Sequence, residues 1–105
     1  MVASFCSGNK LSGFPEAILG CQSLEILELA RNSISSLPER MDKLEALRTI
    51  NLSHNHFDQF PIPICFAPSV AFLDLSHNRL GMLHREIRRM GNLQVVKVSN
   101  NKLAK

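Results

Sequence analysis

Hydrophobic and polar residues recur along the chain with a period of 23 residues. Three hydrophobic columns follow this period through four consecutive units. They are Leu24, Leu47, Val70 and Leu93; Leu27, Ile50, Leu73 and Val96; and Leu29, Leu52, Leu75 and Val98. Because the register is kept from unit to unit, we predict that the chain stacks copies of one small supersecondary unit.

Each unit contains a short alternating segment that predicts a β-strand. In Leu27-Glu28-Leu29 the two leucines point to one side of an extended backbone and the glutamate points to the other. Equivalent strands stacked in parallel, about 4.8 Å apart, would pair their backbones and bury the leucine columns as one continuous core.

The segment that leads from one strand to the next carries a different pattern. Between Pro38 and Leu44 the apolar residues Met41 and Leu44 are three positions apart, which predicts a turn of α-helix or 3₁₀-helix facing the core. Because these return segments are wider than the strands, the stack should curve and leave the strand face concave.

Asparagines occupy one position of the repeat, after each predicted strand. They are Asn9, Asn32, Asn55, Asn78 and Asn101. The chain turns there, and its backbone groups point inward without strand partners. An asparagine amide can both donate and accept hydrogen bonds, so we predict that these residues form a buried structural ladder.

The complete unit reads L-x-x-L-x-L-x-x-N-x-L-x-x-L-P-x-x-I. Its Leu-Pro pair appears as Phe14-Pro15, Leu37-Pro38 and Phe60-Pro61, and His84 replaces the proline in the fourth unit. This pattern resembles the leucine-rich repeat family over essentially the whole chain. The 23-residue unit with LPxxI also resembles the intracellular repeats of the Ras-pathway scaffold, Erbin, Scribble and Ras-suppressor kind, and those of Roco-type kinases.

The resemblance implies an α/β fold, a short right-handed solenoid. Parallel strands would form its concave face, and helical, 3₁₀ or irregular return segments its convex face. We predict a single domain with units at 1–23, 24–46, 47–69 and 70–92 and a partial unit at 93–105. The first unit places Met1, Ser4 and Cys6 at leucine positions, as a degenerate cap would, and the last has no return segment. We therefore expect the chain to be part of a longer array.

The predicted strand face is the candidate binding site, because side chains between the leucines are free to contact a partner. The candidates are Ile26, Glu28, Arg31, Thr49, Asn51, His54, Phe72, Asp74, His77, Val95 and Lys97. An exposed Phe72 beside Val95, flanked by charges, has the character of a binding anchor. The alternative is that these positions are merely solvated.

His54 and His77 each stand in a Ser-His-Asn triplet and should lie one strand apart, about 5 Å. Zinc usually takes three or four ligands, and only His56 or Asp74 could add to this pair. We favour a role in the turn, with no metal site. No serine, histidine and carboxylate form a nucleophile set and no Gly-rich phosphate loop is present, so we predict neither enzyme activity nor a cofactor.

The net charge of +3 is unevenly distributed. Residues 1–78 carry a net charge of −3 and residues 79–105 carry +6. Arg85, Arg88 and Arg89 lie in a return segment, where they could meet an acidic protein or phospholipid headgroups, or simply keep that face solvated. Nucleic acid is not expected, since no aromatic residues are interleaved to stack on bases.

The three cysteines show no CxxC spacing, which favours a reducing, intracellular setting. Cys6 and Cys21 fall in hydrophobic columns and are predicted to be buried, whereas Cys65 beside Phe66 is predicted to be exposed on the return side. The longest uncharged run, residues 59–73, is too short and too rich in proline to cross a membrane. No secretory signal is visible. A glycosylation sequon begins at Asn51.

The function that follows is a non-catalytic protein-interaction module in the cytoplasm. The resemblance implies a scaffold in small GTPase or kinase signalling. One alternative is the recognition segment of a larger Roco-type GTPase-kinase. Another is an extracellular receptor repeat, which the unpaired cysteines and the missing signal disfavour.

Overall fold

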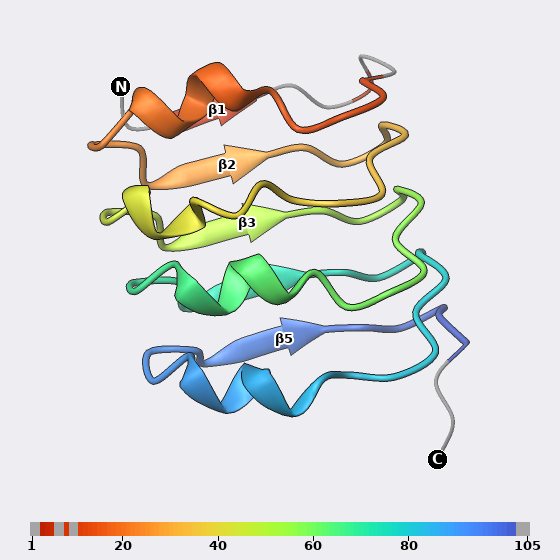
Figure 1. Ribbon diagram of the computed structural model, residues 1–105. Coiled ribbons are helices and arrows are strands. Elements are labelled where there is room, and N and C mark those ends of the chain that lie inside the picture. Colours follow the sequence, from red (N-terminus) through yellow and green to blue (C-terminus); the bar gives the residue numbers. More distant parts are fainter. Residues whose placement is uncertain (1–2, 6–7, 9–10, 103–105) are drawn as a thin grey trace.

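The strands of the computed structural model form one parallel sheet in chain order, β1 to β5 (Figure 1). The structure describes residues 3–5, 8 and 11–102. The strands are β1 (Ala3–Phe5), β2 (Ile26–Glu28), β3 (Thr49–Asn51), β4 (Phe72–Asp74) and β5 (Val95–Lys97). This confirms the predicted solenoid, in which each repeat contributes one strand.

The strand register repeats the sequence period. Ile26 pairs with Thr49, Thr49 with Phe72, and Phe72 with Val95, each step being one repeat. Because side chains alternate along a strand, the central residue of each triplet points into the core while its two neighbours point to the outer, strand face. Residues that are 23 positions apart in the sequence are therefore direct neighbours on adjacent strands of the sheet.

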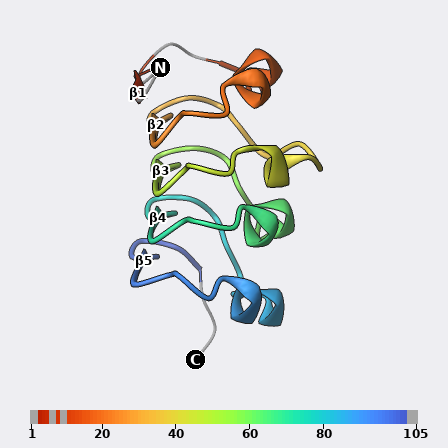
Figure 2. The ribbon, with the colours of Figure 1, turned by 90° about the vertical axis from the view of Figure 1, so that its left-hand side faces the viewer.

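The return segments contain 3₁₀-helices, which line the opposite side of the molecule (Figure 2). They are η1 (Glu16–Gly20), η2 (Met41–Lys43), η3 (Ile62–Phe66) and η4 (Arg85–Arg89). Pro15 and Pro61 immediately precede η1 and η3 with φ of −74° and −75°, the value that the proline ring imposes. We call the side formed by η1 to η4 the return face.

The core lies between the strands and the return segments. Leu27, Ile50 and Leu73, the central residues of β2, β3 and β4, have no exposed surface, and neither do Met41 and Ile64 from the return side. Truncating a fully buried leucine of this kind to alanine typically costs about 2 to 5 kcal/mol. The core is thus a row of equivalent layers that depend on their neighbours.

The prediction for the cysteines was partly wrong. Cys65 is buried, with 4% of its surface exposed, while its neighbour Phe66 is 45% exposed. In η3 the side chains of Ile64 and Cys65 face the core and that of Phe66 does not. Cys21 is only half-buried, and Cys6 lies outside the described residues. No helix among the described residues is long and apolar enough to cross a membrane.

Candidate functional site: the strand face

The strand face carries one column in which three of four residues are apolar and the fourth is Thr49. Ile26 and Val95 are 40% and 41% exposed, and Thr49 and Phe72 between them are half-buried. Ile26, Thr49, Phe72 and Val95 are successive partners in the sheet, so they form one continuous stripe. The outer members of this stripe therefore offer more apolar surface to a partner than Phe72, which the sequence suggested as the exposed anchor.

Phe72 is less exposed than predicted because its neighbours cover it. Thr49 and Val95 flank it in the sheet, and the Lys97 ammonium nitrogen lies 5.5 Å from the centroid of its ring. This is a cation–π contact, which holds the lysine stem over the aromatic surface. Contact with Phe72 would require Lys97 to move or to take part.

The polar residues at the ends of the strands partly serve the fold. The Asn51 side-chain oxygen accepts a hydrogen bond from the backbone N–H of Ser53 at 2.9 Å. A carboxylate oxygen of Asp74 likewise accepts from the backbone N–H and the hydroxyl of Ser76 at 3.0 and 2.6 Å. These bonds fix the exits of β3 and β4. Asn51 and Asp74 therefore combine a local structural role with a position on the candidate surface.

A second column runs along the edge of the strand face where the chain leaves each strand. Arg31, His54, His77 and Asn100 occupy it with positive φ angles of 61°, 56°, 56° and 57°. The His54 and His77 rings stack with centroids 4.1 Å apart and planes inclined by 9°. The Asn100 amide nitrogen lies 3.1 Å from Nε2 of His77. The structure thus brings together the two histidines that the sequence paired.

The pKa of His54 is lowered by its partial burial. The positive charges that His77 and Arg31 can carry act in the same direction, and the Asp74 carboxylate opposes them. Neutral histidine is therefore favoured in the stack. Among the described residues no group of three or more histidine, cysteine, aspartate or glutamate side chains is arranged to hold a metal ion.

Beneath this edge lie the asparagines of the repeat. The Asn55 amide nitrogen donates to the carbonyls of Leu29, Leu52 and Ser53, and its oxygen accepts from the N–H of Ile34. Asn78 repeats these bonds one unit later. Each amide therefore joins two successive units through backbone groups at the turn out of the strand.

The other asparagines of this column differ in their surroundings. Asn32 is buried like Asn55 and Asn78, whereas Asn101 is half-buried. Asn9 lies outside the described residues. The remaining candidates also vary in exposure: Glu28 is half-buried, and Arg31 and Lys97 are exposed.

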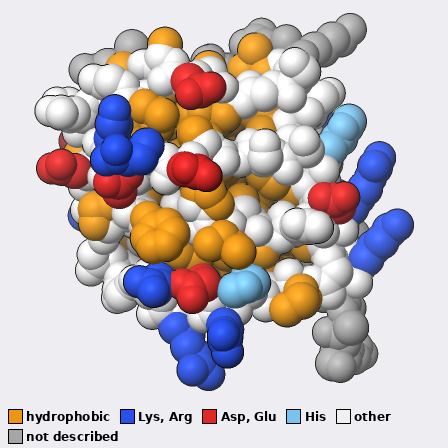
Figure 3. Space-filling model, viewed as in Figure 1, with side chains coloured by type: hydrophobic (Ala, Val, Ile, Leu, Met, Phe, Trp, Pro, Cys, Tyr) orange, Lys and Arg blue, Asp and Glu red, His pale blue; other side chains and the backbone are white. Residues whose placement is uncertain are grey.

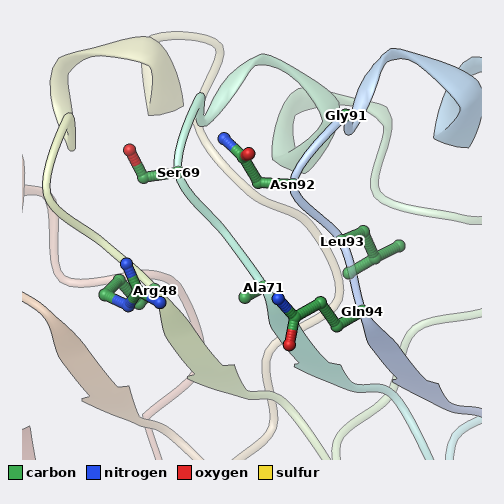
Figure 4. Close-up of a pocket in the computed structure, with 7 residues that line it drawn as sticks. All are labelled: Arg48, Ser69, Ala71, Gly91, Asn92, Leu93 and Gln94. Carbon is green, nitrogen blue, oxygen red and sulfur yellow. The ribbon is translucent and has the colours of Figure 1, made fainter.

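Sequence reasoning missed a polar hollow where the strands begin. It has a volume of about 270 Å³ and is lined by Arg48, Ser69, Ala71, Gly91, Asn92, Leu93 and Gln94 (Figure 4). Arg48, Ala71 and Gln94 are one repeat apart. The hollow exists because a short alanine stands between two long polar side chains. In the sequence, the change from a long to a short side chain along this column was the only feature that indicated the hollow.

Comparison with known proteins agrees with this architecture. The leucine rich repeat family model matches residues 6–57. No curated protein sequence matches the chain. Among solved structures, a leucine-rich repeat protein of Leptospira interrogans is similar over 87% of this chain and 23% of its own, with 28% identity and a TM-score of 0.80.

Two further solved structures show how widely this fold is used. The plant peptide hormone receptor RGFR1, solved in complex with RGF2, is 30% identical over 87% of this chain and 15% of its own, with a TM-score of 0.70. Internalin C2 of Listeria monocytogenes shares the fold, with 21% identity over 88% of this chain and 39% of its own, and a TM-score of 0.73. The chain spans less than a quarter of the length of the first two. Its period, its parallel strand stack and the match over residues 6–57 show that the chain has the fold of a leucine-rich repeat solenoid.

Proposed function

We propose that this chain is a non-catalytic recognition module that binds a protein partner on its strand face. The observation that carries the proposal is the apolar stripe from Ile26 to Val95. Both end residues are large, exposed and apolar, although they stand on a regular sheet where polar residues would cost nothing. The leucine-rich repeat fold is typically used for protein interaction, which supports this reading.

Charges around the stripe suggest how a partner is oriented. Glu28 and Asp74 are acidic, Lys97 and Arg31 are basic, and all four flank the stripe within one or two strands. An apolar centre with mixed charges at its rim is the usual anatomy of a specific protein interface. Such rim charges mainly set orientation and association rate.

We further propose that the module works inside the cell, as part of a scaffold in small GTPase or kinase signalling. Its similarity to intracellular repeats with LPxxI supports this setting. So do Cys21 and Cys65, which are free thiols in the described part of the chain. The same repeats could serve as the recognition segment of a larger Roco-type enzyme, whose catalytic parts would lie outside this sequence.

The test compares the parent chain with the double variant Ile26→Ser and Val95→Ser. Affinity purification from cells, followed by quantitative mass spectrometry, should recover one or more proteins that the double variant recovers at least about tenfold less well. The control is Lys43→Ser, an exposed residue of η2 on the return face. If the double variant and the parent recover the same proteins equally, the strand face is not the interaction site.

A receptor ectodomain is a second candidate, favoured by the 30% identity to a plant receptor solved with RGF2. The sequon at Asn51 separates the two settings, because Asn51 lies in β3 on the strand face and a glycan there would cover the apolar stripe. The chain should be expressed through the secretory pathway and treated with a glycosidase. Complete glycosylation at Asn51 together with loss of strand-face binding would exclude a secreted module that uses this face.

A further inference from the structure

The return face carries a second exposed apolar surface, separate from the strand face. Ile62, Phe66 and Met82 are 36%, 45% and 62% exposed. Figure 3 looks onto this side and shows hydrophobic side chains gathered over η3, with Lys and Arg side chains below them along η4. Of the large hydrophobic residues that are exposed in the described chain, those outside this region are Ile26 and Val95 on the strand face.

Two of these residues line a hollow between the third and fourth repeats. The hollow has a volume of about 280 Å³ and is formed by Asp58, Gln59, Phe60, Ile62, Gly81, Met82 and His84. Phe60 is buried at its base, and Ile62 and Met82 stand exposed at its rim. A hollow of this kind accepts one or two apolar side chains of a partner.

Cationic groups lie directly beside the apolar residues. The Arg89 guanidinium lies 5.4 Å from the centroid of the Phe66 ring and is paired with Glu86. Arg85 and Arg88, in the same 3₁₀-helix, are exposed and form no ion pair with any residue that the structure describes. The local excess of positive charge is therefore available to a ligand.

We infer that Ile62, Phe66, Met82, Arg85 and Arg88 form a second docking surface, which takes an acidic peptide segment carrying an apolar side chain. The peptide should be acidic because Arg85 and Arg88, the cations of η4 without an ion pair in the described chain, are complementary to it in charge. The planar guanidinium group of an arginine binds a carboxylate through a pair of hydrogen bonds. The hollow selects an apolar side chain. A lipid bilayer has no need of such a hollow.

The surface is independent of the strand face. η3 and η4 lie on the opposite side of the repeats from β4 and β5, as Figure 2 shows. The two surfaces can therefore be occupied together, so that the chain would bridge one partner on its strands and an acidic segment on its return face. The inference stands whether or not the strand face binds a protein.

The test selects a phage-displayed library of short random peptides on the full chain and measures the affinity of the enriched peptides. We expect aspartate and glutamate to surround an apolar residue in them. Ile62→Ser with Phe66→Ser, and separately Arg85→Glu with Arg88→Glu, should each weaken binding at least about tenfold. Lys43→Glu, an exposed lysine in η2 on the same face, and Ile26→Ser on the strand face are matched controls expected to change affinity less than about twofold. Circular dichroism and urea unfolding establish that every variant is folded.

Several results would overturn the inference. They are enriched peptides without an acidic bias, no enrichment at all, or binding that is lost only with Ile26→Ser. The last would assign the peptides to the strand face and support the proposed function instead.

A second experiment measures binding of the chain to vesicles that contain phosphatidylserine and to vesicles of pure phosphatidylcholine. Vesicle binding that needs phosphatidylserine, is lost with the arginine variant and exceeds peptide binding would show that this surface meets a membrane, not a peptide.

Discussion

The imidazole rings of His54 and His77 stack with their centroids 4.1 Å apart, and both residues have a φ of 56°. The two observations have one origin. Each chain turn out of a strand needs a residue in the left-handed conformation, and the sheet register places successive turns directly beside each other. A histidine in one turn therefore meets the histidine of the next.

The left-handed conformation predicts how this position tolerates substitution. Histidine and asparagine adopt it more readily than most residues, and Asn100 occupies the same position one repeat later with a φ of 57°. His77→Asn should therefore leave the free energy of unfolding within about 0.5 kcal/mol of the parent. His77→Val, which puts a branched side chain in a left-handed turn, should lower it by about 1 to 2 kcal/mol. Urea unfolding of the two variants measures this, and equal stabilities would mean that the backbone does not constrain the position.

The lowered pKa of His54 predicts a stability that depends on pH. Its burial, together with His77 and Arg31, disfavours the imidazolium in the folded state, so the unfolded chain binds a proton more readily. This contribution to stability is complete above about pH 6.5, the ordinary pKa of histidine, and is lost as the pH falls through the lower folded-state pKa.

The measurement compares urea unfolding at about pH 7.5 and about pH 5.5 for the parent and His54→Asn. The parent should lose more stability between the two values than the variant, which has no titrating group there. Carboxylates titrate alike in both proteins, so the difference isolates His54. An identical loss in both proteins contradicts the prediction.

Asn55 is predicted to be among the most sensitive polar positions. In Asn55→Ala the carbonyl groups of Leu29, Leu52 and Ser53 and the N–H of Ile34 lose their bonds to the amide. The Ile34 N–H has no other acceptor in the described part of the chain and costs about 1 to 3 kcal/mol when left unpaired, whereas the three carbonyls each keep one other hydrogen bond, from Asn32, Asn78 and Arg31. Together with the three lost bonds to the carbonyls, this should lower the free energy of unfolding by at least about 2 kcal/mol. Thermal and urea unfolding provide the value.

Asn92→Ala is the matched control for this substitution. The Asn92 side chain is exposed and makes one hydrogen bond, to the carbonyl of Pro68 at 2.9 Å. Its loss should cost no more than about 0.5 kcal/mol. If Asn55→Ala were no more destabilising than Asn92→Ala, the asparagine column would not carry the stack.

Cys65 is predicted to be a protected thiol. Burial raises its pKa to about 11, and the Glu86 carboxylate adds to this effect. Because the thiolate is the reactive form, a short pulse of iodoacetamide near about pH 8 should modify Cys65 at least about tenfold more slowly than the half-buried Cys21. Peptide mapping by mass spectrometry measures both rates, and the difference should vanish in urea. Equal rates in the folded chain would contradict the burial of Cys65.

Much of the fold follows from periodicity. The columns through Leu27 and Leu29 predicted the strands. The spacing of Met41 and Leu44 predicted an inward turn of α-helix or 3₁₀-helix, and the structure has a 3₁₀-helix there. These features repeat in every unit, so local pattern and neighbouring units agree at each step. The site was less predictable. The repeat register predicted that Ile26, Thr49, Phe72 and Val95 line up on the strand face. It did not predict how much of each side chain is exposed.

The repeat alone was enough to predict the parallel stack and which side chains share a column, because a constant 23-residue step makes sequence register and sheet register the same. Contacts between units decided the rest. Lys97 covers Phe72, the turn of η3 buries Cys65 and exposes Phe66, and a short Ala71 opens a hollow beside Arg48. Each of these depends on the size and direction of side chains from different units that meet only when the chain is folded, and no column considered by itself contains that information.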